Sequence, residues 1–354
     1  MKNRPHVGFI ITKAEVGGAQ RWTLDQIRLL QGDLTPHLIC GDSGWLTDTH
    51  TGESMVLNAM QKRLPSLSGL LQLKDYLASH NIQTLVASSA NAGIYARLVK
   101  LLLPKLRVIY VSHGWSAIYN GGKLAKLYAL IERSLSRLTD LILNVSKADE
   151  TKSTEHIRIP AKKQITILNR TPRPTGPLPP PPARPLRLLY LGRLAHPKRP
   201  DLLITAVRSF SSEEVQLTVI GDGPQRNKLE LLKSGNIHFM GEIRDFNHYH
   251  EHHALCLISD SEGLPMSALE AKAAGIPLLM SDVGGCGELI RPEKPNGLLC
   301  SNDQDAIIKA IQALITSQNE YLDNAQDTAK DAWLEPLKES YLAAYLPQTN
   351  RDHQ

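Results

Sequence analysis

Short apolar runs alternate with amphipathic stretches along almost the whole chain, and this alternation is the strongest structural signal in the sequence. The apolar runs have the length and bounding residues of buried strands, whereas the stretches between them have helical spacing. Such an order predicts an α/β fold in which a parallel sheet carries helices on both faces. The strand-like runs are 6–11, 37–40, 84–89, 107–113, 140–146, 165–168, 187–194, 216–222, 237–241, 254–261, 277–282 and 297–300.

A proline-rich segment divides this pattern into two halves. Residues 171–185 contain eight prolines, which favour extended polyproline geometry and predict a linker. We therefore expect a first doubly wound domain over 1–170 and a second over 186–333. A final helix over about 334–346 is expected to pack back on the first domain.

Length and composition agree with two soluble globular cores. The chain has 354 residues, of which 42% are hydrophobic and 21% charged. Its most apolar stretch, 98–111, is interrupted by cations and Pro104, so no membrane-spanning segment is expected. Neither a signal peptide nor a C-x-x-C pair is evident, which favours a cytoplasmic protein with reduced thiols.

Charge is distributed unevenly between the two halves. Residues 1–170 carry 22 Lys and Arg against 12 Asp and Glu, and much of the excess lies between Arg97 and Arg137. Such a cluster is either an ordinary solvated face or a surface for an anionic membrane or acidic substrate. Nucleic acid is disfavoured as a partner, because aromatic platforms and a recognised binding motif are absent from the region.

Candidate site residues follow the predicted strands, since open α/β sheets bind ligands at the carboxyl ends of their strands. In the first half, Gly17 and Gly18 precede a helix and can admit an anion to its N-terminus, or form a plain turn. His113 follows another strand and is either a polar contact for a ligand or a structural residue. No G-x-G-x-x-G motif appears, which argues against a dinucleotide-dependent dehydrogenase.

The second half contains two weaker segments of the same kind. Arg193 and Lys198 flank a loop after a strand and can converge on a diphosphate, although most loop cations are simply solvated. Gly221 lies in a turn, IGDGP, that has no chemistry of its own.

The segment ISDSEGLPMSALEAKAAGIP carries the most information. Glu262 is expected in a loop after a buried strand, and Glu270 follows inside a helix opened by Pro265. The amides at the helix N-terminus can hold an anion with help from the helix dipole. The free amides lie around Leu264 to Ser267, within a run of candidate site residues that consists of Gly263, Leu264, Pro265, Met266 and Ser267.

These motifs together resemble the retaining family 4 glycosyltransferases of GT-B fold. The resemblance rests on GGAQR, GRL followed by KR, IGDGP, EGLPMSALEA with AAGIP, and DVGGCGELI followed by NGLL, from residue 7 to about residue 300. It implies two Rossmann-like domains that face each other across a cleft. It also implies transfer of a sugar from a nucleoside diphosphate sugar to an acceptor hydroxyl, without cofactor or metal.

The resemblance assigns a role to each candidate. Glu270 would hold the ribose hydroxyls, Glu262 and His113 would contact the donor sugar, and Arg193 with Lys198 would neutralise the diphosphate. Further implied nucleotide-sugar contacts are Gly17 and Gly18 at the phosphates, the backbone near Ile243 at the base, and Gly221. The sequence departs from the family at Asn169-Arg170-Thr171-Pro172, which puts in doubt any contact made by the family's usual N-G turn.

The expected substrates are a UDP-sugar, or a GDP-sugar, and a glycan or lipid-linked acceptor of bacterial surface polysaccharide or lipopolysaccharide synthesis. A cytoplasmic enzyme that binds the inner face of the membrane peripherally would fit this expectation. Two alternatives remain: a non-catalytic sugar-binding or chaperone subunit of the same fold, and a nucleotide-dependent redox enzyme.

The histidine-rich segment HYHEHH, at 248–253, invites a metal interpretation. It coincides with an ordinary surface helix in the family that the chain resembles, and zinc needs three or four converging ligands. We therefore expect solvated histidines here and no metal at the site of transfer.

Overall fold

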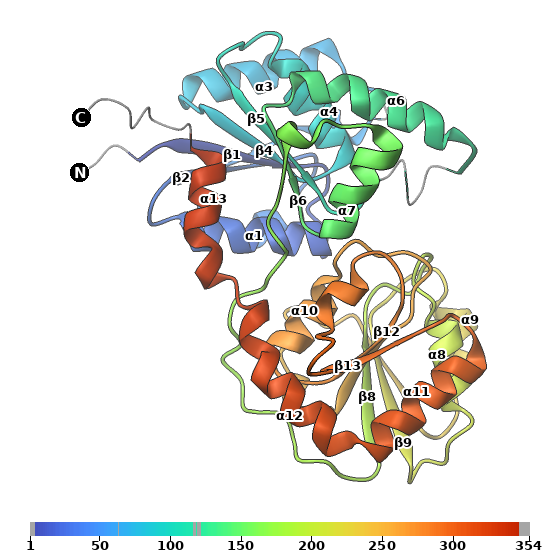
Figure 1. Ribbon diagram of the computed structural model, residues 1–354. Helices are drawn as coiled ribbons and strands as arrows, with labels where there is room; N and C mark the ends of the chain where they lie inside the picture. The colour runs from blue at the N-terminus through green and yellow to red at the C-terminus, as the bar shows by residue number, and fades with distance from the viewer. Residues whose placement is uncertain (1–3, 63, 116–117, 119–121, 347–354) are drawn as a thin grey trace. The chain divides into compact units, whose positions relative to one another are not determined.

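A computed structural model describes residues 4–62, 64–115, 118 and 122–346, and the chain forms two compact units. The first unit comprises Met1–Leu168 and Glu335–Gln354, and the second comprises Asn169–Leu334. Each unit contains one parallel sheet with helices on both of its faces (Figure 1). Two doubly wound units of this kind are the fold class that the alternating pattern predicts.

The sheet of the first unit has seven strands in the order β3-β2-β1-β4-β5-β6-β7. Six of them fall in the predicted runs, whereas β3 is a three-residue edge strand that was not predicted and that pairs only with β2. The strands are β1 (His6–Ile11), β2 (Thr35–Cys40), β3 (Ser54–Val56), β4 (Thr84–Ala87), β5 (Arg107–Ser112), β6 (Leu141–Asn144) and β7 (Gln164–Thr166). The helices are α1 (Gly18–Leu30), α2 (Trp45–Thr49), α3 (Leu67–Ser79), α4 (Ala90–Val99), α6 (Ala125–Leu135), α7 (Lys147–Lys152) and α13 (Lys338–Tyr345).

The sheet of the second unit has six strands in the order β10-β9-β8-β11-β12-β13. The strands are β8 (Leu186–Leu191), β9 (Val215–Ile220), β10 (Ile237–Gly241), β11 (Ala254–Leu257), β12 (Leu278–Ser281) and β13 (Gly297–Cys300). The helices are α8 (Pro200–Val207), α9 (Arg226–Glu230), α10 (Met266–Ala273), α11 (Gln304–Thr316) and α12 (Gln318–Thr328), with the 3-10 turns η6 (Tyr249–Glu251) and η7 (Cys286–Leu289).

The strand order in each sheet reverses at one point. In the first unit the reversal lies between β1 and β4, and in the second it lies between β8 and β11. At such a point the loops leaving two adjacent strands turn to opposite faces of the sheet and leave room between them for a ligand. The topology therefore singles out the loops after β8 and β11.

The proline-rich segment belongs to the second unit. Pro179 is buried, Thr171 forms a bridge with Trp333, and the guanidinium carbon of Arg173 lies 4.5 Å from the centre of the Trp333 ring. The boundary between the units falls just before it, between Leu168 and Asn169.

The helix α13 packs in the first unit although it is the last element of the chain (Figure 1). Its Tyr341 and Tyr345 are fully buried, and the Tyr345 hydroxyl lies 3.2 Å from Oε1 of Gln26 in α1. Thr84 at the start of β4 donates a hydrogen bond to the carbonyl of Tyr345. These contacts fix the end of the chain against the first sheet.

The basic cluster between Arg97 and Arg137 is only partly a surface feature. Arg97 is fully buried; it donates to Glu132 of α6 at 2.8 Å, and its guanidinium lies over the Tyr110 ring. Lys100 pairs with Asp140. The expectation of one solvated basic face is therefore corrected, because Arg97 is buried and both Arg97 and Lys100 are paired with carboxylates.

No helix in the described part of the chain is both long and apolar enough to cross a bilayer.

All four cysteines are buried as free thiols.

Candidate functional site

The loops after β8 and β11 meet at the point where the second sheet reverses its strand order. Lys198, in the first loop, forms an antiparallel bridge with Ser259, in the second. The amide of Arg199 also donates to the carbonyl of Ile258, and that of Asp260 donates to Pro197. Backbone hydrogen bonds alone therefore hold the two loops together.

An ion pair joins the two loops at their centre. Nζ of Lys198 lies 2.5 Å from Oε1 of Glu262, and the Ser259 hydroxyl donates to the same oxygen at 2.5 Å. Glu262 is only 9% exposed, so this pair is largely shielded from water and is stronger than a surface pair. Two donors on Oε1 fix the orientation of the carboxylate. Lysine has three N–H donors, and the contact with Glu262 uses one of them.

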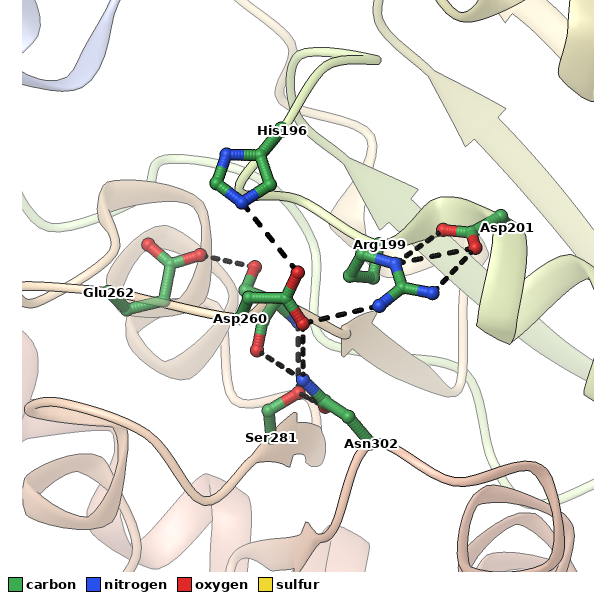
Figure 2. Close-up of polar contacts among 8 residues, drawn as sticks. His196, Arg199, Asp201, Asp260, Glu262, Ser281 and Asn302 are labelled. Carbon is green, nitrogen blue, oxygen red and sulfur yellow. Dashed lines mark hydrogen bonds and ion pairs between the residues drawn. The ribbon is translucent and has the colours of Figure 1, made fainter. Parts of the chain in front are cut away.

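Asp260, in the same loop as Glu262, contacts His196, Arg199 and Asn302 (Figure 2). It accepts hydrogen bonds from Arg199 at 3.3 Å and from Asn302 at 3.0 Å, and the His196 ring lies 3.8 Å away. Asn302 also donates to the carbonyl of Ser259. The arrangement ties the ends of β8, β11 and β13 into one polar network.

Glycines let neighbouring loops approach each other at backbone distance. Gly221, after β9, has a φ of +140°, and a Cβ there would lie 2.0 Å from the carbonyl oxygen of Gly192 in the loop after β8. Gly284, after β12, has a φ of +56°, and its Cβ would lie 1.7 Å from the carbonyl oxygen of Glu262. A side chain at either position would push away the loops that carry Lys198 and Glu262. Gly221 therefore supports the site through packing.

Helix α10 begins directly after the Glu262 loop, as the sequence predicts. Pro265 is its N-cap, so the amides of Met266 and Ser267 in its first turn have no helical carbonyl to bind. Gly263 and Leu264 connect Glu262 to this helix end, and Gly263 accepts a hydrogen bond from the amide of Gly285. Unpaired amides and the helix dipole together favour an anion at this end.

Glu270 lies in the middle of α10 and accepts a hydrogen bond that the sequence did not reveal. The Tyr249 hydroxyl donates to Oε2 of Glu270 at 2.7 Å. Tyr249 is 5% exposed and packs edge-on against Phe246, with ring centres 5.1 Å apart. A rigid phenol thus holds one oxygen of the carboxylate.

Two of the predicted residues stand apart from this network. Arg193 follows β8 but is exposed, and its guanidinium makes no hydrogen bond or ion pair with the residues that the structure describes. Ile243 follows β10 and is 37% exposed. Both lie in loops at the same sheet edge as Lys198.

In the first unit the predicted residues also lie at the carboxyl ends of strands. Gly17 is the N-cap of α1, which begins at Gly18, and His113 follows the end of β5. Trp22 of α1 packs edge-on against the His113 ring, with centres 5.0 Å apart. Burial lowers the pKa of His113 to about 4, so the imidazole is neutral at physiological pH.

A buried lysine lies behind the site. Lys272 of α10 is 5% exposed, and its Nζ donates to the carbonyl of Leu289 at 2.8 Å. Burial lowers the pKa of this ammonium to about 8. The contact fixes the loop that contains Gly284 and Gly285 against α10.

The departure at Asn169 also has a structural role. The Asn169 side chain is buried and its Nδ2 lies 3.0 Å from the sulfur of Met266, in the first turn of α10. This residue therefore packs against the end of the helix that is expected to bind the anion.

Comparison with known proteins assigns the family. The model of group 1 glycosyl transferases matches residues 179–332, and that of Glycosyltransferase Family 4 matches residues 16–169. The O-antigen biosynthesis glycosyltransferase WbnH of Escherichia coli is 44% identical over 331 residues, which cover 92% of this chain and 94% of WbnH. This chain belongs to the glycosyltransferases of group 1 and family 4.

Solved structures of low sequence identity show the same fold. Anabaena HepE in complex with UDP and glucose has a TM-score of 0.82 and 16% identity, and the match covers 97% of this glycosyltransferase and 99% of HepE. The lipopolysaccharide outer core galactosyltransferase WaaB, in its apo form, has a TM-score of 0.72 and 19% identity, with 96% and 99% covered. The GT-B fold expected from the motifs is thus confirmed.

The residues of this glycosyltransferase that sequence reasoning missed are the ones that position the predicted residues. Tyr249 donates to Glu270, Ser259 donates to Glu262, and Asn302 donates to Asp260 and to the carbonyl of Ser259. Ser259 and Asp260 lie in the same motif as Glu262, three and two residues before it, so the sequence does indicate that they are near this carboxylate. Tyr249 lies 21 residues before Glu270, and nothing in the sequence connects the two.

Replacing Tyr249 by Phe tests whether its hydrogen bond to Glu270 supports nucleotide binding. Loss of one hydrogen bond to the half-buried Glu270 carboxylate costs about 1 kcal/mol, so we expect affinity for a nucleoside diphosphate to fall about fivefold in calorimetry. Tyr321→Phe, in the same unit, is the matched control and should bind as the parent does. Equal affinity of Tyr249→Phe and the parent would show that Glu270 does not depend on this contact.

Proposed function

We propose that this glycosyltransferase transfers a sugar, with retention of configuration, from a nucleoside diphosphate sugar to a hydroxyl of a glycan or lipid-linked acceptor. The observation that carries the proposal is the Lys198–Glu262 pair at the strand reversal, directly before the N-terminus of α10. A UDP-sugar is favoured over a GDP-sugar, because HepE, of the same fold, is described in complex with UDP-glucose. The likeness to WbnH supports a role in O-antigen or lipopolysaccharide assembly.

The donor would be bound mainly by the second unit. Glu270 accepts hydrogen bonds from the two ribose hydroxyls, and the backbone near Ile243 contacts the base. The diphosphate lies against the first-turn amides of α10, between Lys198 and Arg193. Glu262 contacts the donor sugar, and the roles of His113, Gly17 and Gly18 in the first unit remain predictions from the family resemblance.

The transfer step follows from the charges at the site. The bond between the anomeric carbon and the phosphate oxygen breaks while the acceptor oxygen bonds to the same face of the sugar. The proton of the acceptor hydroxyl passes to the departing phosphate. Negative charge grows on the diphosphate as the bond breaks, so Arg193, Lys198 and the α10 amides stabilise the transition state more than the bound donor.

The states of the Glu262 carboxylate and the Cys286 thiol support a mechanism without a protein nucleophile. Oxygen Oε1 of Glu262 already accepts from Lys198 and Ser259. Burial and the nearby Glu262 raise the pKa of the Cys286 thiol to about 12, so it does not form a thiolate at neutral pH. In this proposal cations and amides also take the place of a divalent ion at the diphosphate, and no cofactor is used.

We also propose that the first unit binds the inner face of the membrane peripherally. Helix α6 has no buried residue, and Leu124, Leu127 and Ile131 are exposed at helical spacing. Lys126 and Arg133 are exposed on the same helix. An exposed apolar stripe beside basic residues is typical of a helix that lies in the interface of an anionic bilayer, where a lipid-linked acceptor would be found.

Single alanine variants test the transfer chemistry. A panel of UDP-, GDP- and ADP-sugars identifies the donor, and turnover is then measured for Arg193→Ala and Lys198→Ala. Removing one preorganised group that stabilises developing charge lowers turnover by about a hundredfold. Lys233→Ala, an exposed cation of the same unit, is the control and should retain parental turnover.

Arg193→Ala separates the effect on transfer from structural damage better than Lys198→Ala does. The Arg193 guanidinium makes no hydrogen bond or ion pair with the described residues, and its loss leaves Glu262 paired with Lys198. Near-parental turnover in both variants would refute the assigned chemistry. A parent that binds a nucleotide sugar but neither transfers nor hydrolyses it would instead favour a non-catalytic subunit.

Liposome co-sedimentation tests the membrane proposal. Binding should require anionic lipid, weaken as salt is raised, and decrease when four exposed cations of the basic cluster, Lys105, Lys126, Arg133 and Arg137, are changed to Gln. The matched control is the same change at Arg208, Lys228, Lys233 and Lys309 of the second unit. Equal binding to neutral and anionic vesicles would contradict the proposal.

A further inference from the structure

The expectation of solvated histidines in the histidine-rich segment is wrong for His252 and His253, which are buried. The segment folds into the 3-10 turn η6 between β10 and β11. In this turn one ring nitrogen each of His248 and His250 and one carboxylate oxygen of Glu251 all lie within 4.8 Å of one another. Nδ1 of His248 is 3.0 Å from Oε1 of Glu251, and Nε2 of His250 is 4.0 Å from the same atom.

These donor atoms have the spacing of a metal site. Zinc binds imidazole nitrogens and carboxylate oxygens at about 2.0 to 2.2 Å in tetrahedral geometry, which places ligand atoms about 3.3 Å apart. The two distances to Glu251 lie on either side of that value, so small side-chain rotations bring the three groups onto one ion. A hydrogen bond between His248 and Glu251 explains their proximity, but it does not explain why His250 turns toward the same oxygen.

The backbone that carries the three ligands is well fixed. Arg187 donates to the carbonyl of Glu251 at 2.7 Å, and the amide of Glu251 donates to the carbonyl of His248 at 3.1 Å. Between the ligands, Tyr249 is buried. Ordering three side chains on a fixed turn costs less entropy than ordering a flexible loop.

We propose that His248, His250 and Glu251 form a surface site for a zinc-like divalent cation, separate from the groups that carry out transfer. Two imidazoles and one carboxylate supply three ligands, and water completes the tetrahedron. A set of nitrogen and oxygen donors of this kind selects zinc and other late transition ions over magnesium or calcium, which prefer oxygen alone.

The site is connected to the nucleotide-binding carboxylate by one residue. Tyr249 lies between His248 and His250 in the chain, and its hydroxyl donates to Glu270 at 2.7 Å. An ion that fixes η6 also fixes the phenol, so it should raise nucleotide affinity; by linkage, the nucleotide raises zinc affinity by the same factor. This second step rests on the proposed function, whereas the metal site itself does not.

Calorimetric titration of the full, untagged chain with zinc tests the site directly. The parent should bind one equivalent in the micromolar range, and His248→Ala/His250→Ala should bind it at least about tenfold more weakly, because two of three ligands are lost. His238→Ala, which removes an exposed histidine of the same unit, should bind as the parent does. Circular dichroism confirms that each variant is folded. Absence of zinc binding in the parent, or the same binding in the double variant, overturns the proposal.

A second titration tests the connection to Glu270. UDP is titrated with and without zinc into the parent, Tyr249→Phe and the double histidine variant, so that complexes of zinc with UDP in solution affect all three equally. Zinc should increase UDP affinity only in the parent, and Tyr249→Phe should still bind zinc. The same zinc response in all three proteins overturns the connection. Failure of the parent to bind any nucleotide counts against the proposed function and leaves the zinc result standing.

Discussion

The pairing of Lys198 with Glu262 is the interaction on which the site depends, because it joins the two loops that leave adjacent strands in opposite directions. A cation and a carboxylate that are largely withdrawn from water each need a partner, and either one alone would be costly to bury. Ser259 adds a second donor to the same carboxylate oxygen. The position of each loop is therefore set by the other, and the ammonium is oriented before any donor binds.

The rest of the sheet edge is built so that this pair can form. Gly221 lets the loop after β9 pack on the backbone of the loop after β8, and Gly284 lets the loop after β12 pack on the backbone of Glu262. Asp260 and Asn302 connect the same region to the end of β13. Because the contacts at Gly221 and Gly284 are made by backbone atoms, the loops that carry Lys198 and Glu262 are positioned by the scaffold itself. Preorganisation of this kind is the main source of electrostatic stabilisation in enzymes.

Much of the fold could be predicted from the sequence, because every strand except β3 is a short apolar run with a clear boundary. β3 has only three residues at a sheet edge, and such a segment has no distinctive periodicity. Sequence also placed Glu262 after a strand and Glu270 on a helix, since Pro265 marks where that helix begins. The strand order that brings Lys198 to Glu262 is a property of tertiary packing, which residue spacing along the chain does not reveal.

The contacts missed from the sequence join residues that are distant in the chain. Tyr249 was read only as part of a histidine-rich segment, and its hydrogen bond with Glu270 depends on how η6 folds against α10. Arg97 was counted among surface cations, whereas it is buried against Glu132 and Tyr110. In both cases local composition indicated a solvated residue, and tertiary packing gave it a specific partner.

The most direct test of the account is calorimetry of free UDP with Glu270→Gln and Glu262→Gln. A bidentate contact from a charged acceptor to ribose hydroxyls contributes about 1.5 to 3 kcal/mol, so Glu270→Gln should weaken binding about tenfold to a hundredfold. Glu262→Gln should weaken it less than Glu270→Gln does, because it loosens Lys198 only through the lost ion pair, while its own assigned partner, the donor sugar, is absent from UDP. Unchanged affinity in Glu270→Gln, or a loss confined to Glu262→Gln, would contradict the assignment of the two carboxylates.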